Sequence, residues 1–181
     1  MFTQEEIRIA NATYRSKGSS VFDKNGNVRS VVARFVANHV LKDSKILDFG
    51  CGSEFIQGKY LRDLGFDVSG WDFGDNKPKE CVEKLEQVYD VVYASNVLNV
   101  ISSRSMLMET LEQIRGCLKD GGMFIANYPQ SPRKMKISKE ELRIIIQNKL
   151  GGIGRQISGT SCPMWIVTKA NTLNECLNVG A

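Results

Sequence analysis

Hydrophobic and polar positions change period along the chain, and the changes predict strands and helices in alternation. Apolar runs of strand length occupy residues 46–49, 66–71, 89–94 and 123–126. Apolar residues at helical spacing occupy the intervals 28–41, 54–64 and 103–118. Strands that alternate with helices are typical of a parallel α/β sheet. We therefore predict an α/β fold with a Rossmann-like, mostly parallel sheet of about six or seven strands and helices on both faces.

Capping patterns locate further helices near the two ends of the chain. Thr3-x-x-Glu6 predicts a short helix running toward Tyr14, and Ser138-x-x-Glu141 predicts a second helix that ends at Gly151-Gly152. Ser102 or Ser103 is placed to cap the helix before the Asp120-Gly121-Gly122 turn. Two final strands are expected, near residues 153–158 and 164–168.

The stretch ILDFGCGSE, residues 46–54, combines a buried strand, two glycines and a helix start. Gly50 and Gly52 lack a Cβ, so the backbone can take positive φ and a ligand can approach closely. The following helix directs its unpaired N-terminal amides back at this turn. The pattern predicts a nucleotide-type site at the carboxyl end of the first strand, although a tight turn without a ligand has the same local sequence.

A second acidic position strengthens the ligand-site interpretation. Residues 66–72 (FDVSGWD) predict a strand that ends at Asp72, 20 positions beyond Gly52. A carboxylate at the tip of the strand after a glycine turn is placed to accept hydrogen bonds from two ribose hydroxyls. A purely structural acid would not need this position.

Four stretches together resemble class I S-adenosylmethionine-dependent methyltransferases: ILDFGCG, VSGWD, YDVVYASNVLNVI and CLKDGGMFIANYP, between about residues 41 and 168. The resemblance implies S-adenosyl-L-methionine as cofactor and a C-terminal antiparallel strand pair. In that family the glycine turn holds the methionine moiety, the acid after the second strand holds the ribose, and the next residue packs on adenine. The implied cofactor-binding residues are Asp48, Gly50, Cys51, Gly52, Asp72 and Phe73, with Ser95 and Asn96 after the third strand.

The chain also departs from the family pattern. Glu54 stands where a third glycine is usual, and the interval between Asp72 and the strand at Tyr89 is short. We expect a turn at residues 74–78 and a charged helical stretch at 79–87, so that the usual next strand is missing or vestigial. The Asn/Asp-Pro-Pro-aromatic motif of exocyclic-amine methyltransferases is absent. The combination of Gly-Trp-Asp at 70–72, the short interval that follows it and NVLNVI at 96–101 resembles methyltransferases associated with DNA phosphorothioation.

Candidates for the acceptor site come from segments beside the turn. Tyr14 and Arg15 border a polar loop, Asn99 follows the third strand, and Tyr128 follows the fourth. Asn96 and Asn99 could equally cap a helix, and Tyr128 could equally pack as a turn aromatic. No catalytic residue is identified, and the single histidine, His39, is expected to be structural or exposed. A basic cluster could contact a phosphate backbone or form a solvated helix face: Arg133, Lys134, Lys136, Lys139 and Arg143.

Composition narrows the class of protein. The 181 residues predict one methyltransferase-like domain (1–181), with N-terminal helices and a lid loop at 1–41, a cofactor-binding core at 42–169 and a tail at 170–181. The net charge of +4 permits a polyanionic partner without requiring one. The five cysteines show no CxxC spacing, so no zinc or redox motif is expected and the set suits a reduced cytoplasmic protein. No membrane span, signal peptide or metal site is predicted, and the oligomeric state stays open.

Three functions therefore remain: methyl transfer to a nucleic acid, methyl transfer to a small molecule, or a catalytically silent cofactor-binding subunit or regulator. The sulfonium methyl group is already an activated electrophile, so in-line positioning of the acceptor can be enough for transfer.

Overall fold

The computed structural model describes residues 2–14, 30–73, 81–130, 133–157 and 162–171. Its helices are α1 (Gln4–Tyr14), α2 (Val31–His39), α3 (Ile56–Asp63), α4 (Arg104–Cys117) and α5 (Lys139–Leu150). Its strands are β1 (Lys45–Phe49), β2 (Asp67–Trp71), β3 (Tyr89–Ala94), β4 (Leu118–Asn127), β5 (Ile153–Ile157) and β6 (Met164–Thr168). None of these helices is long and apolar enough to cross a membrane.

The strands form one six-stranded sheet in the order β2-β1-β3-β4-β6-β5. The first four strands of the chain pair in parallel, whereas β6 runs antiparallel to both β4 and β5. The predicted α/β sheet with a closing antiparallel pair is therefore confirmed. Because β2 and β3 lie on opposite sides of β1, the strand order reverses there, and ligands of such sheets bind at the carboxyl ends beside this switch point.

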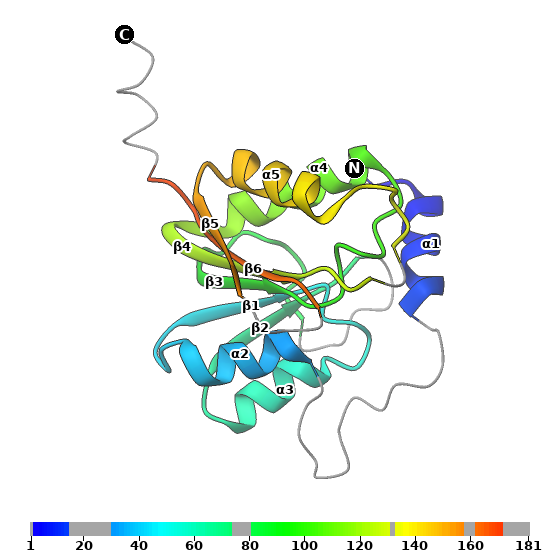
Figure 1. Ribbon diagram of the computed structural model, residues 1–181. Coiled ribbons are helices and arrows are strands. Elements are labelled where there is room, and N and C mark those ends of the chain that lie inside the picture. The colour runs from blue at the N-terminus through cyan, green and yellow to red at the C-terminus, as the bar shows by residue number, and fades with distance from the viewer. Residues whose placement is uncertain (1, 15–29, 74–80, 131–132, 158–161, 172–181) are drawn as a thin grey trace, which may run out of the picture.

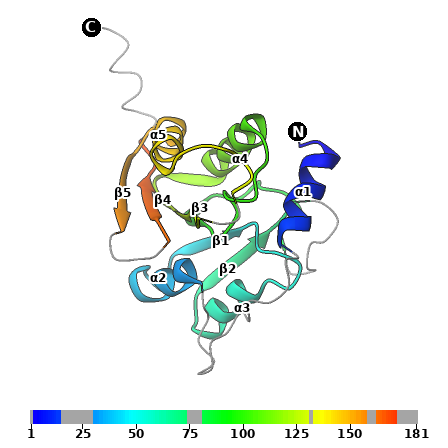
Figure 2. The ribbon, with the colours of Figure 1, turned by 45° about the vertical axis from the view of Figure 1, so that its right-hand side comes forward.

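Helices cover both faces of the sheet (Figures 1 and 2). The α2 and α3 helices lie on one face and pack over a cluster that includes Ile46, Val68 and Tyr93. The α4 and α5 helices lie on the other face over the larger cluster, to which α1 contributes Ala10. Burial of apolar side chains on both faces explains why the central strands read as nearly continuous apolar runs.

Three of the predicted helix starts are confirmed by side-chain caps. Ser103 and Ser138 accept hydrogen bonds from backbone N–H groups of Met106 and Glu141 at 3.0 Å each. At the start of α1, Thr3 and Glu6 form the reciprocal contacts of a capping box. Each cap satisfies donors that the first helical turn leaves unpaired.

The segment after β2 differs from the expected charged helix. The described part of it, residues 81–87, contains no helix; instead Cys81 forms a parallel bridge with Gly70, and Val82 N–H donates to Gly70 O at 2.9 Å. Val82 and Leu85 pack against the larger core cluster. The chain therefore pairs with the outer side of β2 and partly buries two apolar side chains, which leaves the expected vestige of a further strand. The predicted turn at 74–78 lies outside the described residues.

Other boundaries shift by a few residues. The α2 helix begins at Val31, with Ser30 as its cap, and α3 begins at Ile56 because Phe55 has left-handed backbone angles. The β4 strand begins at Leu118 rather than Met123. Its pairing with β3 jumps from Tyr89↔Leu118 to Val91↔Met123, so the Asp120-Gly121-Gly122 turn lies in a bulge of the strand.

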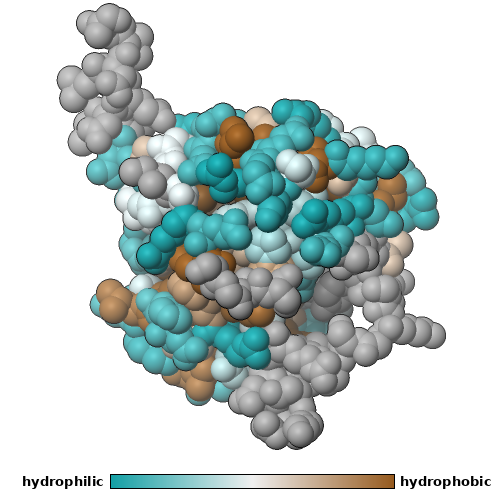
Figure 3. Space-filling view, viewed as in Figure 1, coloured by the Kyte–Doolittle hydropathy of each residue, from teal (hydrophilic) through white to brown (hydrophobic). Residues whose placement is uncertain are grey.

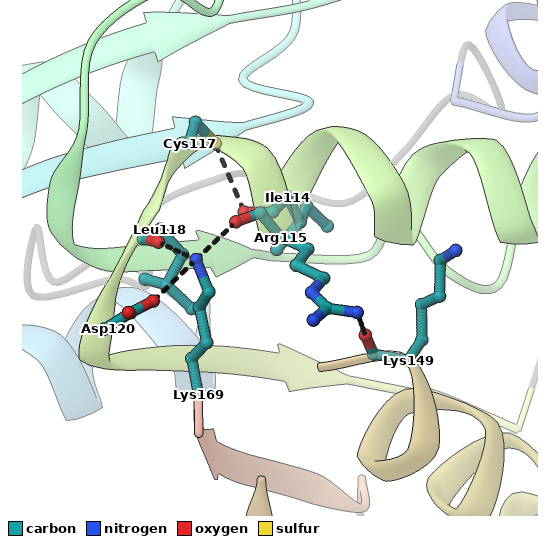
Figure 4. A network of polar contacts seen from close by, with 7 residues as sticks. All are labelled: Ile114, Arg115, Cys117, Leu118, Asp120, Lys149 and Lys169. Atoms are coloured by element: carbon teal, nitrogen blue, oxygen red, sulfur yellow. Dashed lines mark hydrogen bonds and ion pairs between the residues drawn. The ribbon is translucent and has the colours of Figure 1, made fainter. Parts of the chain in front are cut away.

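A lysine joins the C-terminal end of α4 to the end of β6 (Figure 4). It lies at the opposite end of the parallel strands from the glycine turn. Lys169 Nζ donates to the carbonyl oxygens of Arg115 and Leu118 at 3.0 and 2.7 Å and lies 3.2 Å from Asp120 Oδ1. It thereby binds carbonyls that the last turn of α4 leaves without helical partners.

Candidate functional site

The two glycines of the turn close onto the end of β2. Gly50 and Gly52 have φ of 78° and 72°, a region that favours glycine. The N–H groups of Gly50 and Cys51 both donate to Trp71 O, at 2.7 and 3.1 Å. A Cβ on Gly50 would lie 2.5 Å from Val97 Cγ2, so packing of Val97, in the segment after β3, also requires this glycine. The turn is thus fixed by backbone contacts to β2 and by packing against the residues that follow β3.

The carboxylate of Asp72 contacts the turn directly. Asp72 Oδ2 accepts a hydrogen bond from Gly52 N–H at 2.5 Å, and Oδ1 accepts one from Phe73 N–H at 2.6 Å. A carboxylate has about four lone-pair sites, so these two bonds leave acceptor capacity for further donors. Side-chain oxygens and turn amides that lie far apart in the sequence therefore meet at the carboxyl edge of the sheet.

Asp48 is a buried acid behind the turn. Burial raises the pKa of its carboxyl group to about 7, and the charge of Asp72 adds to this rise. The Tyr93 hydroxyl and the Gly58 backbone N–H act in the opposite direction. Neither Asp48 Oδ2 nor the Tyr93 hydroxyl completes a hydrogen bond with a described residue. A buried acceptor without a donor is costly, and a cationic group of a ligand would compensate it.

The Phe73 side chain is buried in a group of aromatic rings. Its ring centroid lies 4.8 Å from those of both Phe2 and Trp71 and 5.7 Å from that of Phe49. Phe2 lies two residues before the start of α1, so the N-terminal segment is packed beside the position expected for adenine. An adenine base that packs on Phe73 would therefore lie next to Phe2 as well.

The carboxyl ends of β3 and β4 are joined by a pair of amides. Asn127 Oδ1 accepts from the Asn96 N–H at 2.6 Å, and Asn127 Nδ2 donates to Asn96 Oδ1 at 2.9 Å. Asn96 has φ of 60°, which is uncommon for a residue with a side chain. Beside it, the Ser95 hydroxyl lies 2.9 Å from that of Ser30, which caps α2. These contacts hold a partly buried polar group at the carboxyl ends of the strands, where the turn also lies.

The substrate candidates have different surroundings. Arg15 lies outside the described residues, and Tyr14 ends α1. Asn99 is 3 % exposed, and its Oδ1 has no hydrogen-bond partner among described residues. Tyr128 is fully buried, with its ring 6.1 Å from that of Trp165, and its backbone N–H donates to Pro163 O. The packing alternative accounts for this position of Tyr128.

The basic cluster is partly used within the protein. The Arg133 guanidinium donates to the carbonyl oxygens of Pro129 and Tyr128 and lies 4.1 Å from the Tyr128 ring centroid. Arg143 donates to Gln147 Oε1 at 2.6 Å, and Lys139 lies 3.8 Å from Glu140 Oε1. Both arginines of the cluster therefore have contacts that compete with phosphate binding.

Two further expectations concern catalysis and metals. His39 is exposed, stacks on Phe35 at a centroid distance of 4.2 Å and contacts Phe35 O, which is a structural arrangement. No three His, Cys, Asp or Glu side chains of the described residues lie close enough together to hold a metal ion.

Sequence reasoning missed Ser30 and Phe2 as neighbours of the site, and it placed Asn127 near the site without giving it a role. Asn127 had one signal, since it follows an apolar strand at the same carboxyl edge as the glycine turn. Phe2 and Ser30 had none, because their contacts depend on how α1 and α2 pack against the sheet.

Comparisons with known proteins are consistent with this geometry. A family model described as "Methyltransferase domain" matches residues 23–153. No curated protein sequence matches the chain significantly.

Among solved structures, a TehB-like SAM-dependent methyltransferase from Corynebacterium glutamicum is similar at 19% identity and a TM-score of 0.61, covering 80% of this chain and 90% of its own. The sugar N-methyltransferase KedS8 from Streptoalloteichus has 11% identity and a TM-score of 0.61, with 86% and 96% covered. A 1,6-didemethyltoxoflavin-N1-methyltransferase from Burkholderia thailandensis, bound to 1,6-didemethyltoxoflavin and S-adenosylhomocysteine, has 14% identity and a TM-score of 0.59, with 77% of each chain covered. At these identities the structures show a shared fold.

Proposed function

We propose how this chain, which belongs to the class I S-adenosyl-L-methionine-dependent methyltransferases, holds its cofactor and its acceptor. The glycine turn and Asp72 hold S-adenosyl-L-methionine. The residues at the carboxyl ends of β3 and β4 bind a small-molecule acceptor. The hydrogen bond between Gly52 N–H and Asp72 Oδ2 carries the proposal, because it joins the turn to the ribose acid. The phosphorothioation resemblance and the cytoplasmic location remain predictions.

The described residues fit the chemical groups of the cofactor. Asp48 offers a buried carboxyl oxygen without a donor, which suits the cationic ammonium of the methionine moiety. Asp72 keeps acceptor capacity for ribose hydroxyls beside the turn. Phe73 is buried among Phe2, Phe49 and Trp71, so we place adenine at the border of this aromatic group. The Glu54 side chain is exposed, so it does not occupy the turn where a third glycine is usual. When bound, the cofactor supplies an electrophilic methyl group.

The acceptor assignment depends on the polar residues after β3 and β4. Two hydrogen-bonded pairs lie there: Ser95 with Ser30, and Asn96 with Asn127. Asn99 adds a buried amide oxygen without a donor. Amides and hydroxyls can orient a nucleophile by hydrogen bonds, and correct orientation alone contributes strongly to a transfer reaction. This arrangement requires no strong base.

A small molecule is favoured over a nucleic acid as acceptor. The basic cluster was the main reason to expect phosphate contacts, but Arg133 and Arg143 make internal contacts. The sugar and toxoflavin methyltransferases described above show that this fold accommodates small acceptors in other proteins. Nucleic acid stays the alternative outcome of the test.

The test is methyl transfer from S-adenosyl-L-methionine carrying a labelled methyl group, with a cell extract as the source of acceptors. We expect the label in the small-molecule fraction, with transfer unaffected by prior nuclease treatment. Nuclease-sensitive label in the nucleic-acid fraction would replace the small-molecule acceptor by a nucleic acid. Cofactor binding without any transfer would instead favour the silent subunit, and Asp72→Asn is the matched control for label incorporation through this site.

A further inference from the structure

Two thiols meet beside the glycine turn. Cys51 Sγ and Cys81 Sγ lie 3.1 Å apart although the residues are 30 positions apart in the sequence. This separation exceeds the length of a disulfide bond by only about 1 Å. Neither cysteine forms a disulfide in this structure, and both are partly exposed to solvent. The missing CxxC spacing concealed the pair, because tertiary contacts create it.

Backbone contacts on both sides hold the pair together. Cys51 is fixed within the turn by its N–H, which donates to Trp71 O at 3.1 Å. Cys81 is fixed by its bridge to Gly70, where a Cβ would lie 2.8 Å from Cys81 Sγ. The missing side chain of Gly70 therefore makes the room that the Cys81 sulfur occupies. Since both anchors are main-chain contacts to β2, the fold itself brings the sulfurs together.

The surroundings decide the order in which the two thiols would react. Burial, followed by the charge of Asp48, raises the pKa of the Cys51 thiol well above its ordinary value. Cys51 is therefore a poor first nucleophile, because the thiolate is the reactive form. We therefore assign the first oxidation to Cys81, and proximity lets Cys51 resolve the product, because the two sulfurs lie 3.1 Å apart.

We propose that Cys51 and Cys81 form an oxidation site that closes to a reversible disulfide and thereby weakens cofactor binding. The oxidant is of the peroxide class. Cys81 sulfur takes one oxygen from hydrogen peroxide, which gives a sulfenic acid and one water. Cys51 sulfur then attacks that sulfur, the S–O bond breaks, and the hydroxide leaves as water with the Cys51 proton. Two thiols are oxidised by two electrons, and one peroxide is reduced to two waters.

The effect on the cofactor rests on the function proposed above and follows from the position of Cys51. The residue lies between two glycines with positive φ, directly before the N–H that Asp72 binds. Closure to a disulfide requires the sulfurs to approach by about 1 Å, which pulls on the turn. A displacement of that size in the turn disturbs the cofactor contacts, and we expect the affinity for S-adenosylhomocysteine to fall at least about tenfold.

The experiment compares reduced and hydrogen peroxide-treated full-length protein. Peptide mapping under non-reducing conditions identifies the cross-link, and calorimetry with S-adenosylhomocysteine measures affinity before treatment, after treatment and after reduction with dithiothreitol. Cys81→Ala is the test variant, and Cys162→Ala is the matched control, since Cys162 is also a partly exposed thiol. We expect the Cys51–Cys81 peptide and the affinity loss in wild type and Cys162→Ala, with both absent in Cys81→Ala and reversed by dithiothreitol.

Three results separate this proposal from the function that it rests on. If treated wild type contains no peptide linking Cys51 to Cys81, the oxidation site is wrong. If the cross-linked protein binds S-adenosylhomocysteine as tightly as the reduced protein, the coupling to the cofactor is wrong. If the reduced protein binds no S-adenosylhomocysteine, the proposed cofactor site fails, while the cross-link is still read independently by mapping.

Discussion

At the scale of single residues, two carboxyl groups with different surroundings define the site. Asp72 is partly exposed and accepts two backbone N–H bonds, which stabilise its charged form. Asp48 is buried, and its pKa is raised to about 7. One acid is thus suited to neutral hydroxyl donors and the other to a cation, which is how a single turn could distinguish the two ends of a nucleoside-linked amino acid.

Asp72→Asn should lower the affinity for S-adenosylhomocysteine by roughly ten- to a hundredfold, because charge-assisted hydrogen bonds contribute on the order of 1.5–3 kcal/mol. The amide also loses one acceptor for Gly52 and Phe73 N–H, so some of the loss could come from the turn. Calorimetry with an analogue lacking both ribose hydroxyls separates the two causes. The analogue should bind the wild type weakly and should lose little further affinity in the variant. If the analogue and the substitution instead weaken binding independently, Asp72 does not bind the ribose.

Asp48 predicts a pH-dependent affinity. If its carboxylate pairs with the ligand ammonium, binding favours the ionised form, and affinity should rise by up to about tenfold per pH unit toward pH 7 and level off above it. Calorimetric titrations between about pH 5 and 9 measure this, with a stable fold verified at each pH. Asp48→Asn should bind with little pH dependence. An unchanged profile in Asp48→Asn would contradict the contact.

The same acid has a measurable effect on the unliganded protein. Its folded-state pKa of about 7 lies above the ordinary value of 3.8, so the folded state binds more protons between these values. The free energy of unfolding should therefore fall by about 1 kcal/mol per pH unit as pH rises through this window. Asp48→Asn should remove this slope in chemical denaturation.

At the scale of elements, α3 positions the turn through one aromatic side chain. Phe55 occupies the N-cap position of α3 with left-handed backbone angles, and no side chain caps the first turn there. The Phe55 residue is completely buried. The ring occupies the space beside Gly58 in the helix and Gly70 in β2. The helix and the second strand are therefore coupled by one side chain, and the Phe55 N–H, which donates to Gly52 O at 3.3 Å, joins them to the glycine turn. The opposite end of the sheet depends on a separate group of contacts around Lys169.

Gly58→Ala tests this coupling, because the new Cβ would lie 1.8 Å from Phe55 Cε2. We expect a loss of about 1–3 kcal/mol in the free energy of unfolding from overpacking, together with weaker S-adenosylhomocysteine binding as Phe55 moves. Gly116→Ala in α4 is the matched control, since no atom lies within 4 Å of its Cβ position. It should stabilise by about 0.5–1 kcal/mol and leave the affinity unchanged. Equal effects of the two substitutions would contradict the role of Phe55.

At the scale of the whole molecule, the surface over α4 and α5 differs from the candidate site at the carboxyl ends of the strands. Hydrophilic residues cover most of the face above the sheet, over α4 and α5, with apolar residues scattered among them (Figure 3). The exposed large apolar residues come from separate segments: Leu41, Leu64, Val88, Met108 and Ile144. Single exposed apolar residues are ordinary on a protein surface. The polar and aromatic groups of the site instead converge at one edge.

Binding at that edge should stabilise the whole fold. A ligand that binds only the native state at about a hundred times its dissociation constant adds about 2.7 kcal/mol, which corresponds to roughly 5–10 °C in Tm for a chain of this size. We expect such a rise with S-adenosylhomocysteine in differential scanning calorimetry and a much smaller one with Asp72→Asn. No shift at millimolar ligand would count against the cofactor site itself.

The sequence alone was sufficient for the alternation of strands and helices, the caps at Thr3 and Ser138, and the turn at Gly50 and Gly52, whereas it left the cap of α4 open between Ser102 and Ser103. These are local features: hydrophobic period, capping side chains and glycine backbone freedom act over a few residues. The family resemblance followed from the same short stretches. The roles of the named cofactor residues remain predictions that the geometry makes specific.

Tertiary structure decided the contacts between segments that are distant in the chain. Residues 81–87 contain no helix because β2 offers an edge to pair with, which no local pattern of charge reveals. Cys51 meets Cys81, 30 positions further along the chain, because the bridge between Gly70 and Cys81 brings the two segments together. The pKa of Asp48 likewise depends on burial by the folded sheet. Such long-range packing and desolvation exist only after the chain has folded, so the sequence pattern could not determine them.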